Sequence, residues 1–294
     1  MLKTSSYTRV RFYKFLPWLL ASLIFVTPSV VAAWNRATPT ESANSYLGFD
    51  QNIYPGDAAL PVLRKTFSFA GYWISPPPEE TTNTWQGKRE ILRKLNFGFL
   101  VLYRGRESKE FKSSADAASK GKADAGDAIT NAKREGFSAN TIIYLDIEEG
   151  GRLSDAYHAY LRAWADALKA GGYRPGVYCS AIPVKEGKGA TITTADDIRS
   201  KEAPRQFSFW VYNDACPPAP GCVAKPAQLS PAGSGDPHAS VWQFAQSPRR
   251  KGLTSKCAAT YARDGNCYAP DDAAHAWFLD LNTANSPDPS GGAK

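Results

Sequence analysis

The sequence predicts an α/β protein with a single (β/α)8, TIM-like barrel domain. Short apolar runs with the composition of β-strands occur eight times, and segments with helical spacing separate several of them. The stretch that contains these runs, residues 46–283, has the usual barrel size of roughly 250 residues. A doubly wound sheet is the alternative, but such a sheet usually carries a Gly-rich phosphate-binding turn, and the sequence has none.

The expected strands are short apolar runs bounded by Gly, Pro or polar residues, and they cover 46–50, 69–75, 97–103, 141–147, 174–180, 207–212, 240–244 and 277–282. The expected helices have Ala-rich composition or apolar residues at helical spacing, and they cover 58–65, 84–95, 115–135 and 155–170. Ser154 is the expected N-cap of the last helix, and Gly171 follows its end. These elements alternate through the first half of the chain, as a barrel requires.

Long loops replace the helices in the second half of the chain, over 213–239 and 246–272. Cys216 and Cys222 bracket the first of two short polar or Pro-rich segments, and Cys257 and Cys267 bracket the second. In an exported protein this spacing predicts two local disulfides that close the loops. A zinc site is the weaker alternative, because no Cys-x-x-Cys pair occurs. Cys179, within an expected strand, is expected to be a buried free thiol.

The two ends of the chain are expected to lie outside the barrel. Residues 1–33 combine a basic start, an apolar stretch and a small-residue end, which is typical of a secretory signal peptide. An uncleaved membrane anchor is the alternative, but two prolines interrupt the stretch, which is short for a span. Residues 34–45 are expected to be a linker, and the Pro/Gly-rich residues 284–294 a disordered tail. We therefore expect a secreted or periplasmic protein with no stable membrane insertion.

Charge argues against a nucleic-acid partner. The full chain has a net charge of +7, and the signal segment holds four basic and no acidic residues. The exported chain would therefore carry only +3, and no basic run has interleaved aromatic residues. The chain also has eight Trp and 14 Tyr residues. Most of these residues are expected to lie in the hydrophobic core, although Trp and Tyr side chains also commonly stack against sugar rings.

The most informative segment is the end of the expected strand 141–147. Asp146 and Glu148 are two residues apart, so they project to the same face of the strand. Two carboxyl groups this close raise the pKa of one of them, which produces a general acid at neutral pH. The alternative is that Asp146 caps the next helix and that Glu148 and Glu149 are solvated loop residues. Because the two glutamates are adjacent, the sequence leaves open which of them serves the site.

Other polar residues fall on expected strand ends, where a barrel places its active site. Asp50 ends the first strand, and Asp280 lies on the last, which barrel closure brings beside the first. Helix capping would explain one such acid, but it does not explain acids on three strands. The sequence therefore predicts that these acids converge on one pocket.

The strand-end motifs together resemble a known family. They are Gly48-Phe49-Asp50, Leu145-Asp146-Ile147-Glu148, Pro175-Gly176-Val177-Tyr178, Val241-Trp242-Gln243-Phe244 and Leu279-Asp280-Leu281-Asn282. In this order they resemble the glycoside hydrolase family 25 lysozymes, and more closely the related secreted bacterial glycoside hydrolase-like barrels of unknown function. The resemblance runs from about residue 46 to residue 282.

The resemblance implies roles for individual residues. Glu148 matches the general acid/base, Asp146 its partner acid, and Asp50 and Asp280 the remaining acids of the pocket. The sugar-binding groove would be shaped by Tyr178, Trp242, Gln243 and Asn282. Glu148 is expected to have a raised pKa, from burial and from nearby Asp146 and Asp280.

By the same resemblance, the expected function is hydrolysis of β-1,4 bonds in peptidoglycan or a related glycan. A non-catalytic glycan-binding barrel is the alternative. No cofactor is expected, and the protein is expected to act as a monomer. The three His residues do not accompany the acids at strand ends, which argues against a His-based metal site. A carboxylate-bound Ca²⁺ or Mg²⁺ stays open as a further alternative.

Overall fold

The computed structural model describes residues 45–213, 230–246 and 279–294, all within the compact unit Glu41–Lys294. The predicted signal peptide and nearly all of the predicted linker lie outside the described residues. The predicted disulfides lie outside them as well, because all four of their cysteines do. Cys179 is described, and it is a buried free thiol, as expected.

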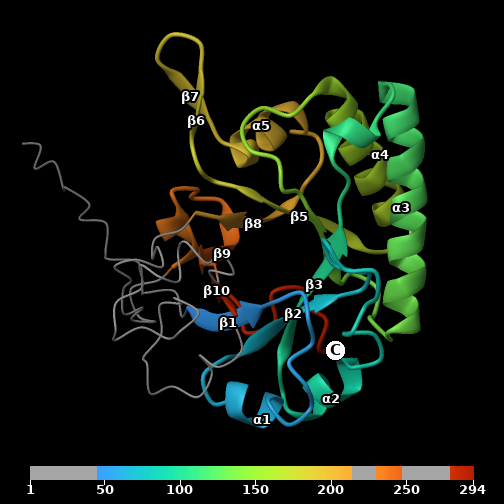
Figure 1. The fold of residues 1–294 in the computed structure, drawn as a ribbon, viewed down its shortest axis with the longest axis vertical. Helices are drawn as coiled ribbons and strands as arrows, with labels where there is room; N and C mark the ends of the chain where they lie inside the picture. The colour runs from blue at the N-terminus through green and yellow to red at the C-terminus, as the bar shows by residue number, and fades with distance from the viewer. Residues whose placement is uncertain (1–44, 214–229, 247–278) are drawn as a thin grey trace, which may run out of the picture. The chain divides into compact units, whose positions relative to one another are not determined.

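Eight strands close a barrel, which confirms the predicted fold class (Figure 1). In chain order, the barrel strands are β1 (Tyr46–Asp50), β2 (Phe69–Trp73), β3 (Gly98–Arg104), β4 (Ile142–Asp146), β5 (Arg174–Ser180), β8 (Ser208–Tyr212), β9 (Ala239–Ala245) and β10 (Asp280–Ala284). They follow one another around the barrel in this order, and β10 pairs with β1 to close it. A hairpin of β6 (Val184–Glu186) and β7 (Ala190–Ile192), which was not predicted, projects from the barrel (Figure 1).

The last strand departs from the (β/α)8 pattern. β10 starts three residues later than expected, and it runs antiparallel to both β1 and β9. An antiparallel strand begins at the end of the barrel where its predecessor finishes, so no helical crossover is needed between them. As a result the first residue of β10, rather than its last, lies at the same end as the final residues of the parallel strands. Asp280 is that residue, and its register partner is Asp50.

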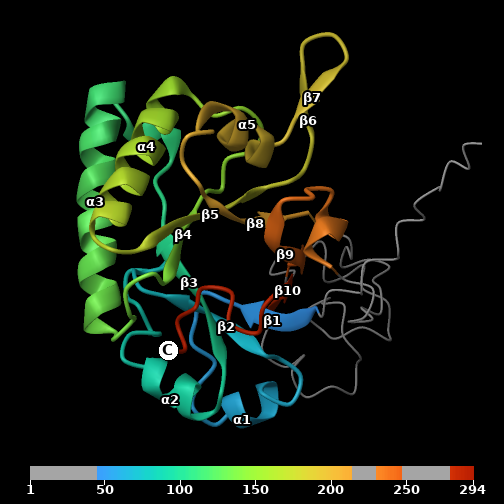
Figure 2. The same cartoon turned by 180° about the vertical axis from the view of Figure 1, so that it is seen from behind.

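The helices cover the outside of the barrel unevenly. They are α1 (Leu60–Leu63), α2 (Arg89–Lys94), α3 (Ser114–Arg134), α4 (Asp155–Ala170) and α5 (Thr194–Lys201), of which α5 was not predicted. Both α1 and α2 are shorter than expected. The long α3 and α4 pack side by side (Figure 2). Their approach is close because a Cβ at Gly121 would collide with the backbone of Tyr160. Ser154 caps α4 as predicted, accepting a hydrogen bond from the Tyr157 N–H at 3.1 Å.

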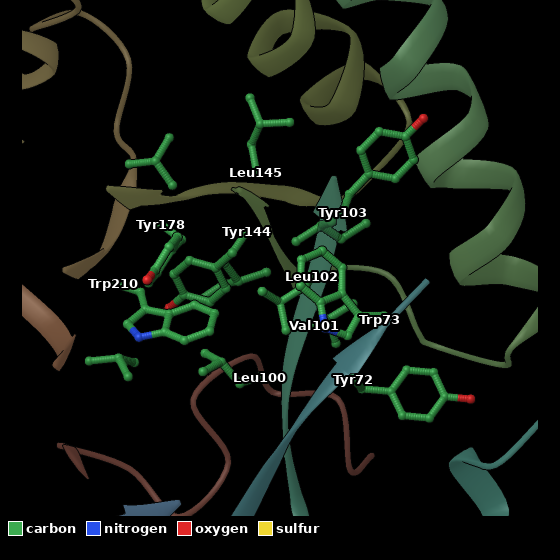
Figure 3. Close-up of a cluster of buried hydrophobic side chains, with 14 of the residues drawn as sticks. Tyr72, Trp73, Leu100, Val101, Leu102, Tyr103, Tyr144, Leu145, Tyr178 and Trp210 are labelled. Atoms are coloured by element: carbon green, nitrogen blue, oxygen red, sulfur yellow. The ribbon is translucent and has the colours of Figure 1, made fainter. Parts of the chain in front are cut away.

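Alternating side chains divide the barrel core into an inner and an outer layer (Figure 3). Tyr144, Tyr178 and Trp210 gather inside the barrel, whereas Tyr72 and Tyr103 point outward. All of them are buried. The inner aromatic rings contact each other directly, with centroids 4.5 Å apart for Tyr178 and Trp210. This inner layer forms the floor beneath the strand ends that carry the acids.

The residues after β10 differ from expectation, because they pack against the barrel instead of forming a disordered tail. Asp288 accepts a hydrogen bond from the Phe99 N–H at 2.9 Å, and the Ser290 hydroxyl accepts one from the Val101 N–H at 2.8 Å. The carbonyl of Ser290 accepts a third, from the Ile142 N–H at 2.9 Å. The segment therefore supplies hydrogen-bond partners to β3 and to the start of β4. Its composition concealed this role, because polar side chains and backbone rather than apolar residues make the contacts.

Candidate active site

A cavity of about 450 Å³ opens at the end of the barrel where the parallel strands finish. Its described lining is Asp50, Asn52, Trp73, Pro78, Glu79, Leu102, Arg104, Glu107, Asp146, Glu148, Tyr178, Trp210, Gln243, Gln246 and Asp280. All four acids predicted for the site belong to this lining. The prediction that acids from separate strands converge on one pocket is therefore confirmed.

Asp50 is fixed at the end of β1 by two side-chain amides. Its Oδ1 accepts hydrogen bonds from Gln243 Nε2 at 3.0 Å and from Asn282 Nδ2 at 2.6 Å. Space for this carboxyl comes from Gly71 on the neighbouring strand, where a Cβ would collide with the Cβ of Asp50. Asp50 is buried, so these amides offset part of the cost of removing a carboxylate from water.

The same amides extend a hydrogen-bond network across the pocket floor. Asn282 accepts from the Trp210 indole N–H at 2.9 Å, and Gln243 accepts from the Tyr178 hydroxyl at 2.7 Å. Gln246 Nε2 donates to Gln243 Oε1 at 2.9 Å and approaches the Tyr178 hydroxyl at 3.2 Å. Each side chain is held by its neighbours, so the floor is rigid before any ligand arrives.

Asp146 and Glu148 form a coupled carboxyl pair. The pKa of Asp146 lies well above its ordinary value, because the group is buried and because Glu148 and Asp50 are close to it. A hydrogen bond joins the two carboxyl groups and raises the pKa of Asp146 further. Partial desolvation raises the pKa of Glu148 as well, while the hydrogen bond from Asp146 opposes that rise.

The raised pKa of Glu148 and its expected cause, burial, agree with the prediction. The contact with Asp146 differs from expectation, because it lowers the pKa of Glu148 instead of raising it. Glu148 remains exposed at the pocket mouth, whereas Asp146 is buried. The pair thus has a buried inner member, whose pKa is well above its ordinary value, and an outer member that a ligand can reach.

Arg104 supplies positive charge at the end of β3. Its side chain is exposed, and its charge lowers the pKa of Asp146 against the larger effect of burial. The following loop lies close to β4, since a Cβ at Gly105 would collide with the carbonyl oxygen of Asp146. Arg104 is the single basic side chain in the described lining of the pocket.

Glu149 has a different task from Glu148. Its carboxylate accepts hydrogen bonds from the Ser108 N–H at 2.5 Å and from the Ser108 hydroxyl at 2.6 Å. Its backbone carbonyl accepts one from the Thr194 hydroxyl at 3.1 Å. Glu149 therefore joins the β4–α4 loop to the loop after β3 and to the start of α5. The Glu149 carboxylate is thus occupied by hydrogen bonds, whereas Glu148 lines the pocket. The sequence did not distinguish these two adjacent glutamates.

Two of the four residues predicted to contact sugar do not line the pocket. Trp242 lies on the outer side of β9, where its indole N–H donates to the Asn213 carbonyl at 2.9 Å and its ring packs against Gly233. Strand alternation explains this, because Gln243 faces the interior and Trp242 must face away. Asn282 is buried beneath the lining and supports Asp50. Tyr178 and Gln243 do line the pocket.

Sequence reasoning missed several lining residues. Trp210 is the register partner of Tyr178 on the neighbouring strand. Register partners face the same side of a sheet, so the strand pairing explains why Trp210 points inward. Trp73 and Arg104 end β2 and β3, and the rule that barrel sites lie at strand ends would have found them. Gln246 follows β9 and has no comparable signal in the sequence.

Other candidate chemistry lies away from the pocket. His158 is buried between Asp197 and Glu202, with ring nitrogens 2.9 and 3.1 Å from their carboxylates, so it has a structural role. Within 45–213, 230–246 and 279–294, no group of three or more His, Cys, Asp or Glu side chains is arranged to hold a metal ion. No helix among these residues is long and apolar enough to cross a membrane.

Comparison with protein families gives one match. Residues 84–255, more than half of the chain, match the family described as Rv2525c-like, glycoside hydrolase-like domain. The matched segment contains the Asp146–Glu148 pair, Tyr178 and Gln243. A search of the curated proteins found no match.

Solved structures match this chain at low sequence identity. An uncharacterised protein from B. stearothermophilus is 19% identical, with a TM-score of 0.50 over 81% of this chain and 95% of that one. The Mycobacterium tuberculosis Tat-secreted protein Rv2525c is 14% identical, with a TM-score of 0.48 over 83% and 96%. A family GH25 lysozyme from Aspergillus fumigatus is 15% identical, with a TM-score of 0.43 over 83% and 95%.

Proposed function

This chain belongs to the Rv2525c-like family of glycoside hydrolase-like domains, and from that premise we propose that it hydrolyses β-1,4 glycosidic bonds of peptidoglycan or a related glycan. The observation that carries the proposal is the Asp146–Glu148 pair, two hydrogen-bonded carboxyl groups with raised pKa values that both line an acidic pocket. Glycoside hydrolysis requires one protonated carboxyl group and one carboxylate on opposite sides of the scissile bond. The pocket supplies both, together with further acids.

Glu148 is the proposed general acid, because it is the member of the pair that a substrate can reach. It transfers a proton to the glycosidic oxygen as the bond from that oxygen to the anomeric carbon breaks. That proton reaches Glu148 from Asp146, through the hydrogen bond between the two carboxyl groups. Water then adds its hydroxyl to the anomeric carbon and returns a proton to the pair, so that atoms and charge balance.

Asp50 and Asp280 are proposed to stabilise the positive charge that develops on the sugar ring. Both line the pocket, and they occupy paired positions on neighbouring strands. The two amides that hold Asp50 keep its carboxylate oriented before substrate binds, so little reorganisation is needed in the transition state. Tyr178 and Trp210 provide an aromatic floor for the sugar.

Export through the predicted signal peptide would bring the protein to peptidoglycan in the periplasm or outside the cell. The pocket is open at one end of the barrel, as binding within a long polymer requires. The substrate is therefore proposed to be a polysaccharide rather than a small metabolite.

Reducing-sugar release from purified peptidoglycan and from chitin-like oligomers tests this proposal. The protein is expected to release product, and Glu148→Gln is expected to lose about 10²–10⁴-fold in rate while keeping its fold. Glu149→Gln is not a matched control, because Glu149 joins three loops; Glu80→Gln, outside the pocket lining, is suitable. Full activity in Glu148→Gln would refute the assignment of the acid. Retention on the polymer without release by either protein would favour a binding-only barrel.

A further inference from the structure

We propose that Thr194 and Asp197, both on α5, are positioning residues for Glu148: they hold the loop between β4 and α4, and so fix how far the Glu148 carboxyl group reaches into the pocket. The proposal rests on the proposed function, because it concerns the same general acid. Neither residue belongs to the described lining of the pocket, so both would act through the loop.

The loop between β4 and α4, residues 147–153, does not hold its own shape. It contains no helix or strand, and no backbone hydrogen bond among the described residues joins one loop residue to another. Gly150 and Gly151 lie in its middle, and the φ of Gly151 is 77°, in the region that favours glycine. Contacts from other elements must therefore determine where the loop lies, and with it Glu148.

Helix α5 supplies such contacts near both ends of the loop. The Thr194 hydroxyl donates to the carbonyl of Glu149 at 3.1 Å. One oxygen of Asp197 accepts from the N–H of Leu153 at 2.8 Å, and the other accepts from Arg152 Nη1 at 3.0 Å. Both α5 side chains are fully buried. The first contact lies directly after Glu148, and the others lie just before α4.

Asp197 is a costly residue at its buried position. A carboxylate removed from water must be paired and hydrogen-bonded, and apolar side chains of similar volume often give equal stability. The start of α5 does not need it, because the N-cap Thr193 accepts from the Asp196 N–H at 3.0 Å. His158 on the adjacent α4 (Figure 2) holds it from the other side, with Nε2 at 2.9 Å. What the carboxylate adds is a fixed acceptor for the loop.

Glu148 lies between two fixed points of the backbone. The N–H of Ile147 donates to the Tyr178 carbonyl at 3.0 Å, and the carbonyl of Glu149 accepts from Thr194. Desolvation raises the pKa of Glu148, so its protonation depends on how deep its carboxyl group lies. Release of the second point would let the carboxyl group move toward water, which would lower its pKa.

The first test follows the carboxyl carbon of Glu148 by NMR through a pH titration, with the signal assigned by its loss in Glu148→Gln. Thr194→Val removes the hydroxyl but keeps the shape of the side chain, and it is expected to lower the pKa of Glu148. Thr194→Ser keeps the hydroxyl and is expected to titrate like the parent protein. Thr130→Val is the matched control, because the Thr130 hydroxyl donates to the Gly126 carbonyl at 2.9 Å within α3. The control should leave the titration unchanged.

Steady-state kinetics on glycan oligomers are the second test. Thr194→Val is expected to lower kcat about three- to tenfold with little change in KM, because a displaced acid affects the reaction more than binding. The alkaline limb of its kcat profile should move to lower pH, since the acid then ionises at lower pH.

Arg152→Gln tests the contact with Asp197 from the solvent side, because the Arg152 side chain is 47% exposed. It is expected to lower kcat and the pKa of Glu148 in the same direction as Thr194→Val. Arg152 also pairs with Glu186 at 2.6 and 2.8 Å. Glu186→Gln removes only that second partner, so it is the control and should leave both quantities unchanged.

The outcomes separate this inference from the proposed function. A lower pKa of Glu148 in Thr194→Val, but not in Thr194→Ser, supports the role of Thr194 whether or not product is released. An unchanged pKa in Thr194→Val would overturn it, as would a loss of kcat that is equal at every pH. Unchanged pKa and kcat in Arg152→Gln would overturn the role of Asp197. Absence of turnover in the parent protein would refute the hydrolase, and the NMR titration would still decide the inference.

Discussion

Asp146 shows how a single residue connects stability to function. The group is buried, and its pKa is raised by burial and by the neighbouring carboxyls. A carboxyl whose pKa is higher in the folded state than in the unfolded state loses stability as pH rises above the unfolded value of about 4. The site is thus destabilised at neutral pH by the same burial that holds its proton.

Asp146→Asn should therefore stabilise the protein at neutral pH, by about 0.5–2 kcal/mol. The amide has no charge to bury, so the gain should be largest at pH 7 and should shrink as pH falls through 4, below which the carboxyl is protonated in both states. Urea unfolding of both proteins across this pH range measures the difference. An equal gain at pH 4 and pH 7 would contradict the raised pKa. Activity should fall in the same variant.

At the scale of elements, the loop from β4 to α4 positions the site. Glu148 lies in this loop, and Glu149 fixes the loop through Ser108 and Thr194. Ser108 begins the short 3-10 helix Ser108–Glu110, which follows the pocket residues Arg104 and Glu107. The Glu149 carboxylate therefore joins the loops that follow the neighbouring strands β3 and β4, both of which carry residues of the pocket.

Glu149→Gln should lower kcat by about tenfold with little change in KM, because a misplaced general acid affects the reaction more than binding. Ser108→Ala removes the hydroxyl bond but keeps the bond from its N–H, so it should have an intermediate effect. Steady-state kinetics on the same oligomers would separate kcat from KM. An increase in KM alone, with kcat unchanged, would mean that Glu149 does not position the acid.

For the whole molecule, closure of the barrel depends on segments from both ends of the described chain. Strand β10 lies between β9 and β1 in the barrel, and the residues after it form hydrogen bonds with β3. Asp288 accepts hydrogen bonds from the N–H groups of Phe99, Gly292 and Ala293 at 2.9, 3.1 and 3.0 Å. Arg89 donates to the carbonyls of Gly292 and Lys294. The C-terminal residues therefore belong to the folded unit.

Asp288→Ala should lower the free energy of unfolding by about 1–3 kcal/mol, because it removes the acceptor for these three N–H groups. Asp288→Asn keeps an acceptor oxygen at the same place and should lose less. Chemical denaturation of the two variants beside the parent protein measures this order. Equal stability of Asp288→Ala and the parent would show that the hydrogen bonds of Asp288 do not stabilise the fold.

Local sequence predicted most strands of the barrel because each is a short apolar run between strong breakers. β5 matches its expected bounds, and the cap of α4 at Ser154 was found from one hydroxyl residue at the right position. The helices α1 and α2 were overestimated, because their apolar spacing continues into turns. The tail was misjudged, because backbone hydrogen bonds such as that to Ser290 leave no mark in composition.

The sequence by itself determined the barrel and the four acids of its pocket, because strand periodicity and strand ends are local properties. Tertiary structure alone decided the direction of β10, the outward position of Trp242 and the role of Glu149. It also decided which carboxyl of the pair is buried, and this burial raises the pKa of Asp146 well above its ordinary value. These properties depend on which groups other strands and loops bring close, and such distances are fixed only when the barrel closes.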